Sequence, residues 1–314
     1  MVKVLIPQTV TDIPSFTNCH IVTFNPTAPI PQEHRDADAI VIWDVPADRI
    51  AQLPTELPHI RLVQTLTAGT DVVEKAGFGA DVAICSGRGL HDETVAEHSL
   101  ALILAAARSI NLLVRAQIGH RWADELGGNL PEPYPGRFTT LKNAHVVIWG
   151  YGSIGRTLGD YLLNLGAKVT GIATSTRVEN GVAVKTAESL PSILPSADVL
   201  VMILPDTPNT VKALNADILE ALPHHAWLIN VGRGRTVDHD ALVDSLREGT
   251  LGGAALDVTD PEPLPVDSPL WDMPNVMITP HAAGGRPRGV KELLEDNIRA
   301  LIEDSPLRNT VTRI

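Results

Sequence analysis

The sequence predicts an α/β protein with a doubly wound parallel sheet and a second, smaller α/β domain. Three observations support this class. Short apolar segments alternate with segments of helical periodicity along most of the chain. A glycine-rich turn near the middle of the chain joins a strand pattern to a helix pattern. The 314 residues exceed the usual size of one domain, so we expect two.

Composition and charge restrict the kinds of partner. A hydrophobic content of 44% with 20% charged residues is ordinary for a soluble α/β protein. The net charge of −12 disfavours binding to nucleic acid or to an anionic membrane surface. Cys19 and Cys85 are too few for a disulfide framework, and the longest apolar run, Leu100–Ala107, is too short to span a membrane. Because the N-terminus also lacks a signal-peptide pattern, we expect a cytoplasmic protein.

Residues 1–90 predict a small α/β unit whose strands are separated by proline-rich turns. Small residues and a glycine follow the fourth strand, in Thr67–Thr70. The backbone N–H groups of such a turn suit a carboxylate ligand, although an ordinary βα turn is the simpler interpretation of this segment alone. The five expected strands are Val2–Ile6, His20–Thr23, Ala39–Trp43, Leu62–Thr65 and Val82–Cys85.

The segment Glu93–Ile118 predicts one long helix with Asp92 as its N-cap. Its apolar residues cover most of the circumference, so we expect it to be buried between other elements. We interpret Glu97 and His98 as surface or interface polar residues. His91 and His98 are seven positions apart without a third ligand nearby, so no metal site is predicted.

A β-α-β unit follows the Gly/Pro-rich stretch 127–136, which indicates a crossing between two domains. The strand Val146–Trp149 leads into a GxGxxG turn, a helix up to Gly166 and a second strand, Lys168–Ala173. This context is the one that a Rossmann dinucleotide site requires, whereas a merely structural glycine turn is the alternative. In the Rossmann interpretation, the first glycine allows a tight turn, the second lets backbone amides approach a pyrophosphate, and the third allows close packing of helix and strand. Those glycines are Gly150, Gly152 and Gly155, with Ser153 and Ile154 at the helix N-terminus.

Alternation continues to the end of the chain. We expect strands at Ala197–Leu204, Trp227–Asn230, Gly253–Val258 and Asn275–Thr279, helices capped by Asn215 and Asp238, and a last helix at Gly289–Asp304. Ligands of such sheets bind beyond the carboxyl ends of the strands. That rule indicates Pro205–Thr210, Asn230–Arg235, Asp257–Pro265 and Thr279–Gly285.

Three groups at these strand ends suit one reaction. Arg233 can clamp a carboxylate and polarise a neighbouring carbonyl. His281 can exchange a proton near neutral pH, and a carboxylate such as Glu262 stabilises the imidazolium. With a nicotinamide, they suffice to interconvert a 2-oxo acid and a 2-hydroxy acid. Each residue alone could be an ordinary surface group, since the chain has eleven histidines; their joint placement supports the catalytic interpretation.

The motifs resemble those of the D-isomer-specific 2-hydroxyacid dehydrogenase family over essentially the whole chain. The matching segments are VAEHSLALILAAAR, GYGSIG, LPDTPNT, NVGRGRTVDHDALVDSLREGTLGGAALDVTDPEPLP and ITPHAAGG. By this resemblance, Arg233 binds the substrate carboxylate and keto oxygen, Glu262 pairs with the imidazole, and His281 is the acid/base. The backbone amides of Ala68 and Gly69 would bind the substrate carboxylate. The remaining cofactor site would include Leu204, Pro205, Thr210, Val231, Gly232 and Asp257.

The resemblance also implies the domain arrangement and a homodimer. A Rossmann cofactor domain, residues 93–285, would be inserted in a smaller flavodoxin-like substrate domain, residues 1–92 plus 286–314. Substrate specificity would depend on Thr65–Thr70, on Arg88–Leu90 and on a partner subunit's loop near Trp122–Tyr134.

The second strand departs from the pattern of NAD-dependent relatives. Such enzymes carry an acidic residue at its end, which binds the ribose hydroxyls. Here Ala173 occupies that position, and no acid precedes Glu179. Without that carboxylate, a 2′-phosphate is not repelled, so we predict NADP in preference to NAD. The alternative is that Arg177 points to solvent and the enzyme accepts either cofactor. The groups expected to bind the phosphate are Thr174, Ser175, Thr176 and Arg177.

Glyoxylate or hydroxypyruvate is the expected type of substrate. A phosphoglycerate dehydrogenase is the alternative enzyme, although an end at Ile314 leaves no room for an appended regulatory domain. Formate and phosphite dehydrogenases are further relatives. A cofactor-sensing protein resembling transcriptional co-repressors is the alternative outside enzymes, and the intact Arg233, Glu262 and His281 argue against it.

Overall fold

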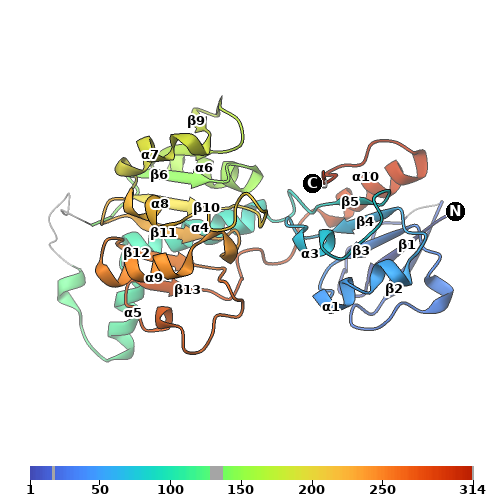
Figure 1. Ribbon diagram of the computed structural model, residues 1–314, viewed down its shortest axis with the longest axis horizontal. Coiled ribbons are helices and arrows are strands. Elements are labelled where there is room, and N and C mark those ends of the chain that lie inside the picture. The colour runs from blue at the N-terminus through green and yellow to red at the C-terminus, as the bar shows by residue number, and fades with distance from the viewer. Residues whose placement is uncertain (16–17, 128–136, 313–314) are drawn as a thin grey trace. The chain divides into compact units, whose positions relative to one another are not determined.

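The computed structural model describes residues 1–15, 18–127 and 137–312 (Figure 1). The chain divides into two compact units. The first comprises Met1–His91 and Arg286–Ile314, and the second comprises Asp92–Gly285. The first unit therefore combines both ends of the chain. Each unit is described by itself.

The first unit is built on a parallel sheet of five strands in the order β2-β1-β3-β4-β5, which is the order of flavodoxin-like folds. Three of these strands, β1, β3 and β4, are mostly apolar and buried on both faces, whereas the edge strand β2 is largely half-buried or exposed. All five predicted strands are confirmed within one residue at each end: β1 (Val2–Pro7), β2 (Cys19–Phe24), β3 (Ala39–Ile42), β4 (Leu62–Thr65) and β5 (Ala83–Cys85).

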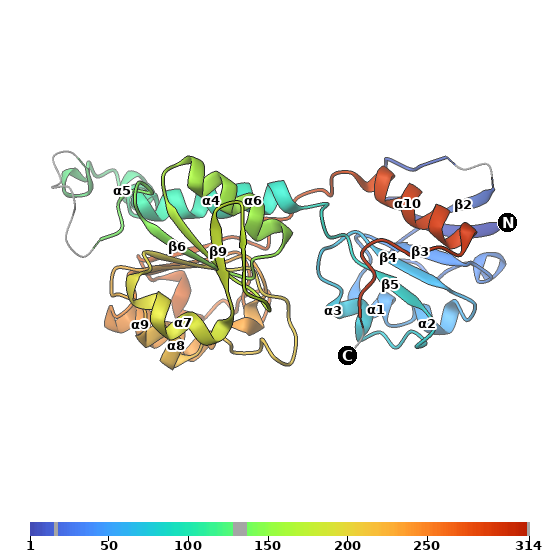
Figure 2. The same cartoon turned by 90° about the horizontal axis from the view of Figure 1, so that it is seen from above.

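Helices cover both faces of this sheet (Figure 2). The predicted C-terminal helix is present as α10 (Val290–Glu303), and its apolar stripe packs on one face. Three one-turn helices pack on the other face, and they were not predicted because four residues are too few to show helical periodicity. They are α1 (Ala47–Ile50), α2 (Leu53–Glu56) and α3 (Asp71–Glu74).

The second unit contains a sheet of eight strands in the order β13-β12-β11-β10-β6-β7-β9-β8. All pairs are parallel except β8 with β9. The order β9-β7-β6-β10-β11-β12 is the Rossmann arrangement, whose direction reverses between β6 and β10. The strands are β6 (His145–Trp149), β7 (Lys168–Ile172), β8 (Arg177–Glu179), β9 (Val182–Lys185), β10 (Val199–Met202), β11 (Trp227–Asn230), β12 (Gly253–Leu256) and β13 (Val276–Ile278).

Helices lie on both faces of this sheet as well (Figure 2). The layer with α4 (Asp92–Ala107) and α6 (Ser153–Asn164) packs on one face. The layer with α7 (Leu190–Ile193), α8 (Ala216–Glu220) and α9 (His239–Glu248) packs on the other. The fold is therefore the doubly wound α/β class that the sequence predicts.

The prediction of one long helix over Glu93–Ile118 is wrong. The chain forms α4 and then α5 (Ile110–Ile118), bent by 70° relative to each other. The break is at Ser109, which has a left-handed φ of 52°, and its hydroxyl accepts a hydrogen bond from Arg137 at 2.8 Å. Tertiary contacts also hold α5, because Arg115 donates to the carbonyls of Trp271 and Met273. No glycine or proline marks the break, so local sequence does not reveal it.

The expected burial of this segment applies only to α4. A stripe along α5 is exposed at positions four residues apart: Ile110, Val114 and Ile118 are 44%, 45% and 74% exposed. Within the described residues, no single helix has the length and apolar composition to cross a membrane; only the bent pair α4–α5 meets both criteria, on length and composition alone.

The three predicted caps have different outcomes. Asn215 caps α8 as predicted, and its side chain accepts from the Ile218 N–H at 3.1 Å. Asp238 precedes α9 without a capping hydrogen bond, because its carboxylate pairs with Lys212 Nζ at 3.2 Å instead. Asp92 is the first residue of α4 and not its N-cap.

Candidate active site

The glycine turn after β6 has the geometry that the motif requires. Gly150 has a φ of 103°, and a Cβ at this position would lie 2.5 Å from the Ile203 carbonyl oxygen. A Cβ on Gly155 would lie 2.9 Å from the Gly150 carbonyl oxygen. These two positions exclude larger residues. A Cβ on Gly152 would meet nothing within 4 Å, so the backbone there is open to a ligand.

The N-terminus of α6 suits an anion. Its N-cap, Gly152, supplies no side-chain cap, and no acidic residue lies in the first turn, which begins with Ser153 and Ile154. Backbone N–H groups and the helix dipole therefore favour a phosphate at this end. The Ser153 hydroxyl donates to Asp92 Oδ1 at 3.1 Å, which ties the turn to α4. The residues present fit the pyrophosphate of a dinucleotide.

The segment after β7 is exposed at Thr174, Ser175 and Thr176 and then enters β8 at Arg177. The guanidinium of Arg177 does not extend into solvent. It donates from Nη2 to the carbonyl oxygen of Tyr151, inside the glycine turn, at 3.0 Å. This contact places a cation beside the turn.

The loops after β10 and β11 are packed together. A Cβ on Gly232 would lie 2.7 Å from the backbone nitrogen of Leu204, and Leu204 and Val231 are buried. The Thr210 hydroxyl donates to the Pro205 carbonyl at 2.5 Å and accepts from Thr207 N–H at 2.9 Å, which closes the first of these loops. The residues expected beside the cofactor thus share one edge of the sheet.

The backbone of Arg233 is held rigidly after β11. The buried side chain of Asn230 donates to the Arg233 carbonyl at 3.2 Å, and the Thr236 hydroxyl donates to the same oxygen at 2.6 Å. The Arg233 guanidinium donates to the Gly232 carbonyl at 2.8 Å. A Cβ on Gly234 would lie 1.9 Å from the Thr259 carbonyl, so the Arg233 loop packs against the loop that carries Glu262.

Glu262 and His281 are in direct contact. Glu262 Oε1 lies 2.6 Å from His281 Nδ1, although 19 residues separate them in sequence. Both side chains are nearly half exposed. The structure therefore brings together the predicted acid/base and its carboxylate partner, and Nε2 is the nitrogen that remains for a substrate.

Asp257 holds the loop that carries His281. The Asp257 side chain is buried, and its carboxylate accepts from Thr279 Oγ1 at 2.6 Å, Ala282 N–H at 2.8 Å and Ala283 N–H at 3.0 Å. Its carbonyl oxygen accepts from the His281 N–H at 2.8 Å. These four bonds keep His281 in a left-handed conformation with a φ of 51°. The contact of Asp257 with a nicotinamide stays a prediction.

His98 is a half-buried polar residue at an interface inside the second unit, one of the two positions that the sequence interpretation allows. His98 Nε2 lies 3.1 Å from Thr279 Oγ1 and 3.4 Å from Asp257 Oδ1. The helix α4 brings this imidazole under the strand ends, where it supports the His281 loop. Nothing in its neighbouring residues indicates this position, because its partners lie far along the chain.

The predicted carboxylate loop belongs to the first unit. Ala68 is exposed and Gly69 half-buried in the turn after β4, and the Thr67 hydroxyl donates to the Gly69 carbonyl at 2.7 Å. Of the loop predicted near Trp122–Tyr134, residues 128–134 lie outside the described residues. Trp122 itself is 89% exposed.

An anion-binding glycine turn, a strand-end arginine and a carboxylate–imidazole pair define an oxidoreductase that binds a nicotinamide dinucleotide. Comparisons with known proteins identify the family. The model of the D-isomer specific 2-hydroxyacid dehydrogenase NAD-binding domain matches residues 100–283. The chain belongs to this family, and it is an NAD(P)-dependent enzyme that acts on 2-hydroxy acids.

Sequence and structure relatives agree with this assignment. A glycerate dehydrogenase of Methylorubrum extorquens is 31% identical over 86% of this chain and 84% of its own. A crystal structure of a D-isomer specific 2-hydroxyacid dehydrogenase from Xanthobacter autotrophicus with NADPH and MES has a TM-score of 0.82 at 29% identity, covering 98% of this chain and 97% of that one. An NADPH-dependent glyoxylate/hydroxypyruvate reductase from Sinorhizobium meliloti with NADP and sulfate has a TM-score of 0.82 at 26% identity, covering 99% and 98%.

Proposed function

We propose that this enzyme reduces a small 2-oxo acid of the glyoxylate or hydroxypyruvate type to the D-2-hydroxy acid. The observation that carries the proposal is the 2.6 Å contact between His281 Nδ1 and Glu262 Oε1, on a loop packed against the one that carries Arg233. The names of the relatives support the substrate type.

Each of the three side chains has one role in the proposed reaction. Arg233 binds the carboxylate and polarises the keto oxygen. When bound, a nicotinamide would supply the hydride for the keto carbon. His281 Nε2 donates the proton that the oxygen takes up, while Glu262 stabilises the imidazolium and fixes its orientation. In the first unit, the amides of Ala68 and Gly69 are assigned to the substrate carboxylate.

NADP is the proposed preferred cofactor. The strand end that would carry a ribose-binding acid has Ala173, and Arg177 donates to the glycine turn beside it. A guanidinium and three hydroxyls offer a 2′-phosphate the partners that it needs. The ratio of kcat/KM for NADPH and NADH tests this, and a preference for NADH would contradict it.

A panel of 2-oxo acids assayed with NADPH tests the reaction. Glyoxylate or hydroxypyruvate should give the highest kcat/KM. Higher activity with 3-phosphohydroxypyruvate would favour the phosphoglycerate dehydrogenase alternative. Tight NADPH binding without turnover of any 2-oxo acid would favour the cofactor-sensing alternative.

A homodimer in the cytoplasm completes the proposal. The exposed stripe on α5 is the surface that we assign to the second copy, since burying it would remove apolar area from water. The proposed reducing compartment rests on the sequence, in which Cys19 and Cys85 are too few for a disulfide framework.

A further inference from the structure

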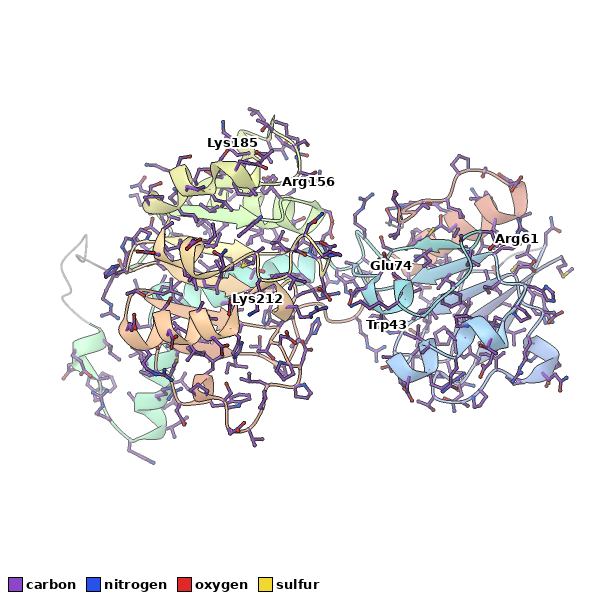
Figure 3. The ribbon with its side chains drawn as sticks, in the orientation of Figure 1. Trp43, Arg61, Glu74, Arg156, Lys185 and Lys212 are labelled. Carbon is purple, nitrogen blue, oxygen red and sulfur yellow. The ribbon has the colours of Figure 1, made fainter. Side chains whose placement is uncertain are left out.

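Glu179, in β8, lies between two arginines. Its Oε2 accepts from Arg177 Nε at 2.9 Å, and its Oε1 accepts from Arg156 Nη1 at 3.0 Å. Arg156 belongs to the first turn of α6 and is labelled in Figure 3. One carboxylate thus neutralises one of two guanidinium charges, and the cluster of the three residues keeps a net charge of +1.

The position of this cluster relates it to the cofactor site. Arg156 directly follows Gly155, the last glycine of the turn, and Arg177 donates to the Tyr151 carbonyl within the turn. The Tyr151 side chain is packed tightly between two elements, because a Cβ on Gly171 in β7 would lie 2.5 Å from its Cγ and a Cβ on Gly159 in α6 would lie 2.7 Å from its hydroxyl oxygen. The end of the second strand is where Rossmann enzymes distinguish a 2′-hydroxyl from a 2′-phosphate.

We propose that Glu179 limits the preference for NADPH by competing with the 2′-phosphate for Arg177 and Arg156. This inference rests on the proposed NADP site and adds two residues to it. A 2′-phosphate carries about −1.5 to −2 charges near neutral pH and binds guanidinium groups more strongly than a single carboxylate does. NADH, which lacks this phosphate, leaves both ion pairs intact.

Glu179 acts as a competitor because Arg177 does not need it for its position. Two backbone carbonyls also hold the Arg177 guanidinium, that of Tyr151 at 3.0 Å and that of Ser175 at 3.4 Å. The backbone of Arg156 lies in α6, so its place next to the glycine turn does not depend on Glu179. The bond from Arg177, together with Arg156, holds the pKa of Glu179 below its usual value, so the carboxylate is charged at neutral pH.

The test is the ratio of kcat/KM for NADPH to that for NADH in Glu179→Gln. Removing one charged competitor should raise this ratio about tenfold. Glu188→Gln is the matched control, since Glu188 is exposed in the same unit and bonds to Thr186 instead of an arginine. An unchanged or lower ratio in Glu179→Gln would overturn the inference.

Two arginine variants separate this inference from the proposed cofactor preference. Arg156→Gln should lower the ratio and weaken inhibition by 2′-AMP without affecting 5′-AMP; equal effects on both nucleotides would overturn the assignment of Arg156. Arg177→Gln should lower the ratio more strongly. If Arg177→Gln has no effect, the proposed NADP site is wrong. If it lowers the ratio while Glu179→Gln has no effect, only the competition is wrong.

Discussion

Both the side chain and the backbone of His281 are held in place. Glu262 holds Nδ1, and the backbone is kept at a positive φ by hydrogen bonds to Asp257. A histidine in this conformation costs free energy that the surrounding bonds must offset. Backbone strain of this kind, at the end of a strand, is typical of a residue whose side-chain orientation matters for catalysis.

His281→Ala should lower kcat by about 100-fold or more, because the variant removes the proton donor of the transition state. NADPH binding, measured by fluorescence titration, should stay within about twofold, since the anion site lies on the glycine turn. His224→Ala is the control, as His224 is exposed in the same unit. Near-normal turnover in His281→Ala would show that another group is the acid/base.

Glu262→Gln should lower kcat about tenfold or more, because the variant loses the carboxylate that orients the His281 ring through Nδ1. KM for the 2-oxo acid should change less, since Arg233 still binds the substrate carboxylate. Steady-state turnover at saturating NADPH measures both constants. A kcat equal to that of the wild-type enzyme would contradict the pairing.

Thr279→Val tests whether the hydrogen bonds that hold the His281 loop are needed for turnover. The variant keeps the shape of the side chain but removes the hydroxyl that donates to Asp257 and contacts His98. A lost hydrogen bond to a buried carboxylate costs about 1.5–3 kcal/mol, so kcat should fall about tenfold while NADPH binding is kept. Thr279→Ser, which retains the hydroxyl, should restore most of the activity. Equal kcat values in both variants would show that the bond is dispensable.

The sequence allows Arg233, Glu262 and His281 to be chosen because each directly follows a buried strand. It does not reveal the support beneath them. The resemblance places Asp257 in the cofactor site, and it does not show that the Asp257 carboxylate also holds the loop of His281. The position of His98 depends on the folding of α4 against strand ends more than 150 residues away, which no local pattern contains.

At the scale of elements, the ion pair between α1 and α2 is a buried source of stability. Arg49 donates from Nη1 and Nη2 to the two oxygens of Glu56, at 3.1 Å and 3.0 Å, and Ile30 N–H donates to the same carboxylate at 2.9 Å. Burial raises the pKa of Glu56, but the bonds from Arg49 and Ile30 outweigh it and bring this pKa below its usual value.

Because this pKa is lowered by folding, the pair stabilises the protein above pH 4.5, the ordinary value for Glu, and the contribution is lost as the pH falls below it. Glu56→Gln should be destabilised by about 3–5 kcal/mol at pH 7, since it leaves Arg49 buried without its charge partner. Its melting temperature should fall less steeply than that of the wild type below pH 4.5. Glu33→Gln, an exposed site in the same unit, should melt like the wild type. Parallel pH curves for Glu56→Gln and the wild type would contradict the argument.

Elements were predictable where burial on both faces left continuous apolar runs. This accounts for β1, β3, β4, β6, β10, β11 and β12, whereas β2, β7 and β13 are only partly buried and were indicated by short apolar runs. The hairpin β8–β9 was missed because it alternates polar and apolar residues over very few positions. The break between α4 and α5 was missed because tertiary contacts hold Ser109 in a conformation that its sequence does not demand.

At the scale of the whole molecule, the chain order explains the two units. The chain completes the five-stranded flavodoxin-like sheet, builds the Rossmann sheet, and returns with α10 to cover one face of the first sheet. Each sheet is covered on both faces by its own helices. The apolar stripe of Ile110, Val114 and Ile118 on α5 is exposed and does not contribute to the core of the second unit.

Ile118→Asp should convert the proposed dimer to a monomer of 33.7 kDa, because it places a charge on the most exposed position of this stripe. Light scattering after size-exclusion chromatography measures the mass directly. Val266→Asp is the matched control: Val266 is 97% exposed in the same unit but lies outside the stripe, so this variant should stay dimeric. Thermal unfolding of Ile118→Asp should remain cooperative, since the substitution leaves the core unchanged. A monomeric wild-type enzyme, or a dimeric Ile118→Asp, would show that α5 does not hold two copies together.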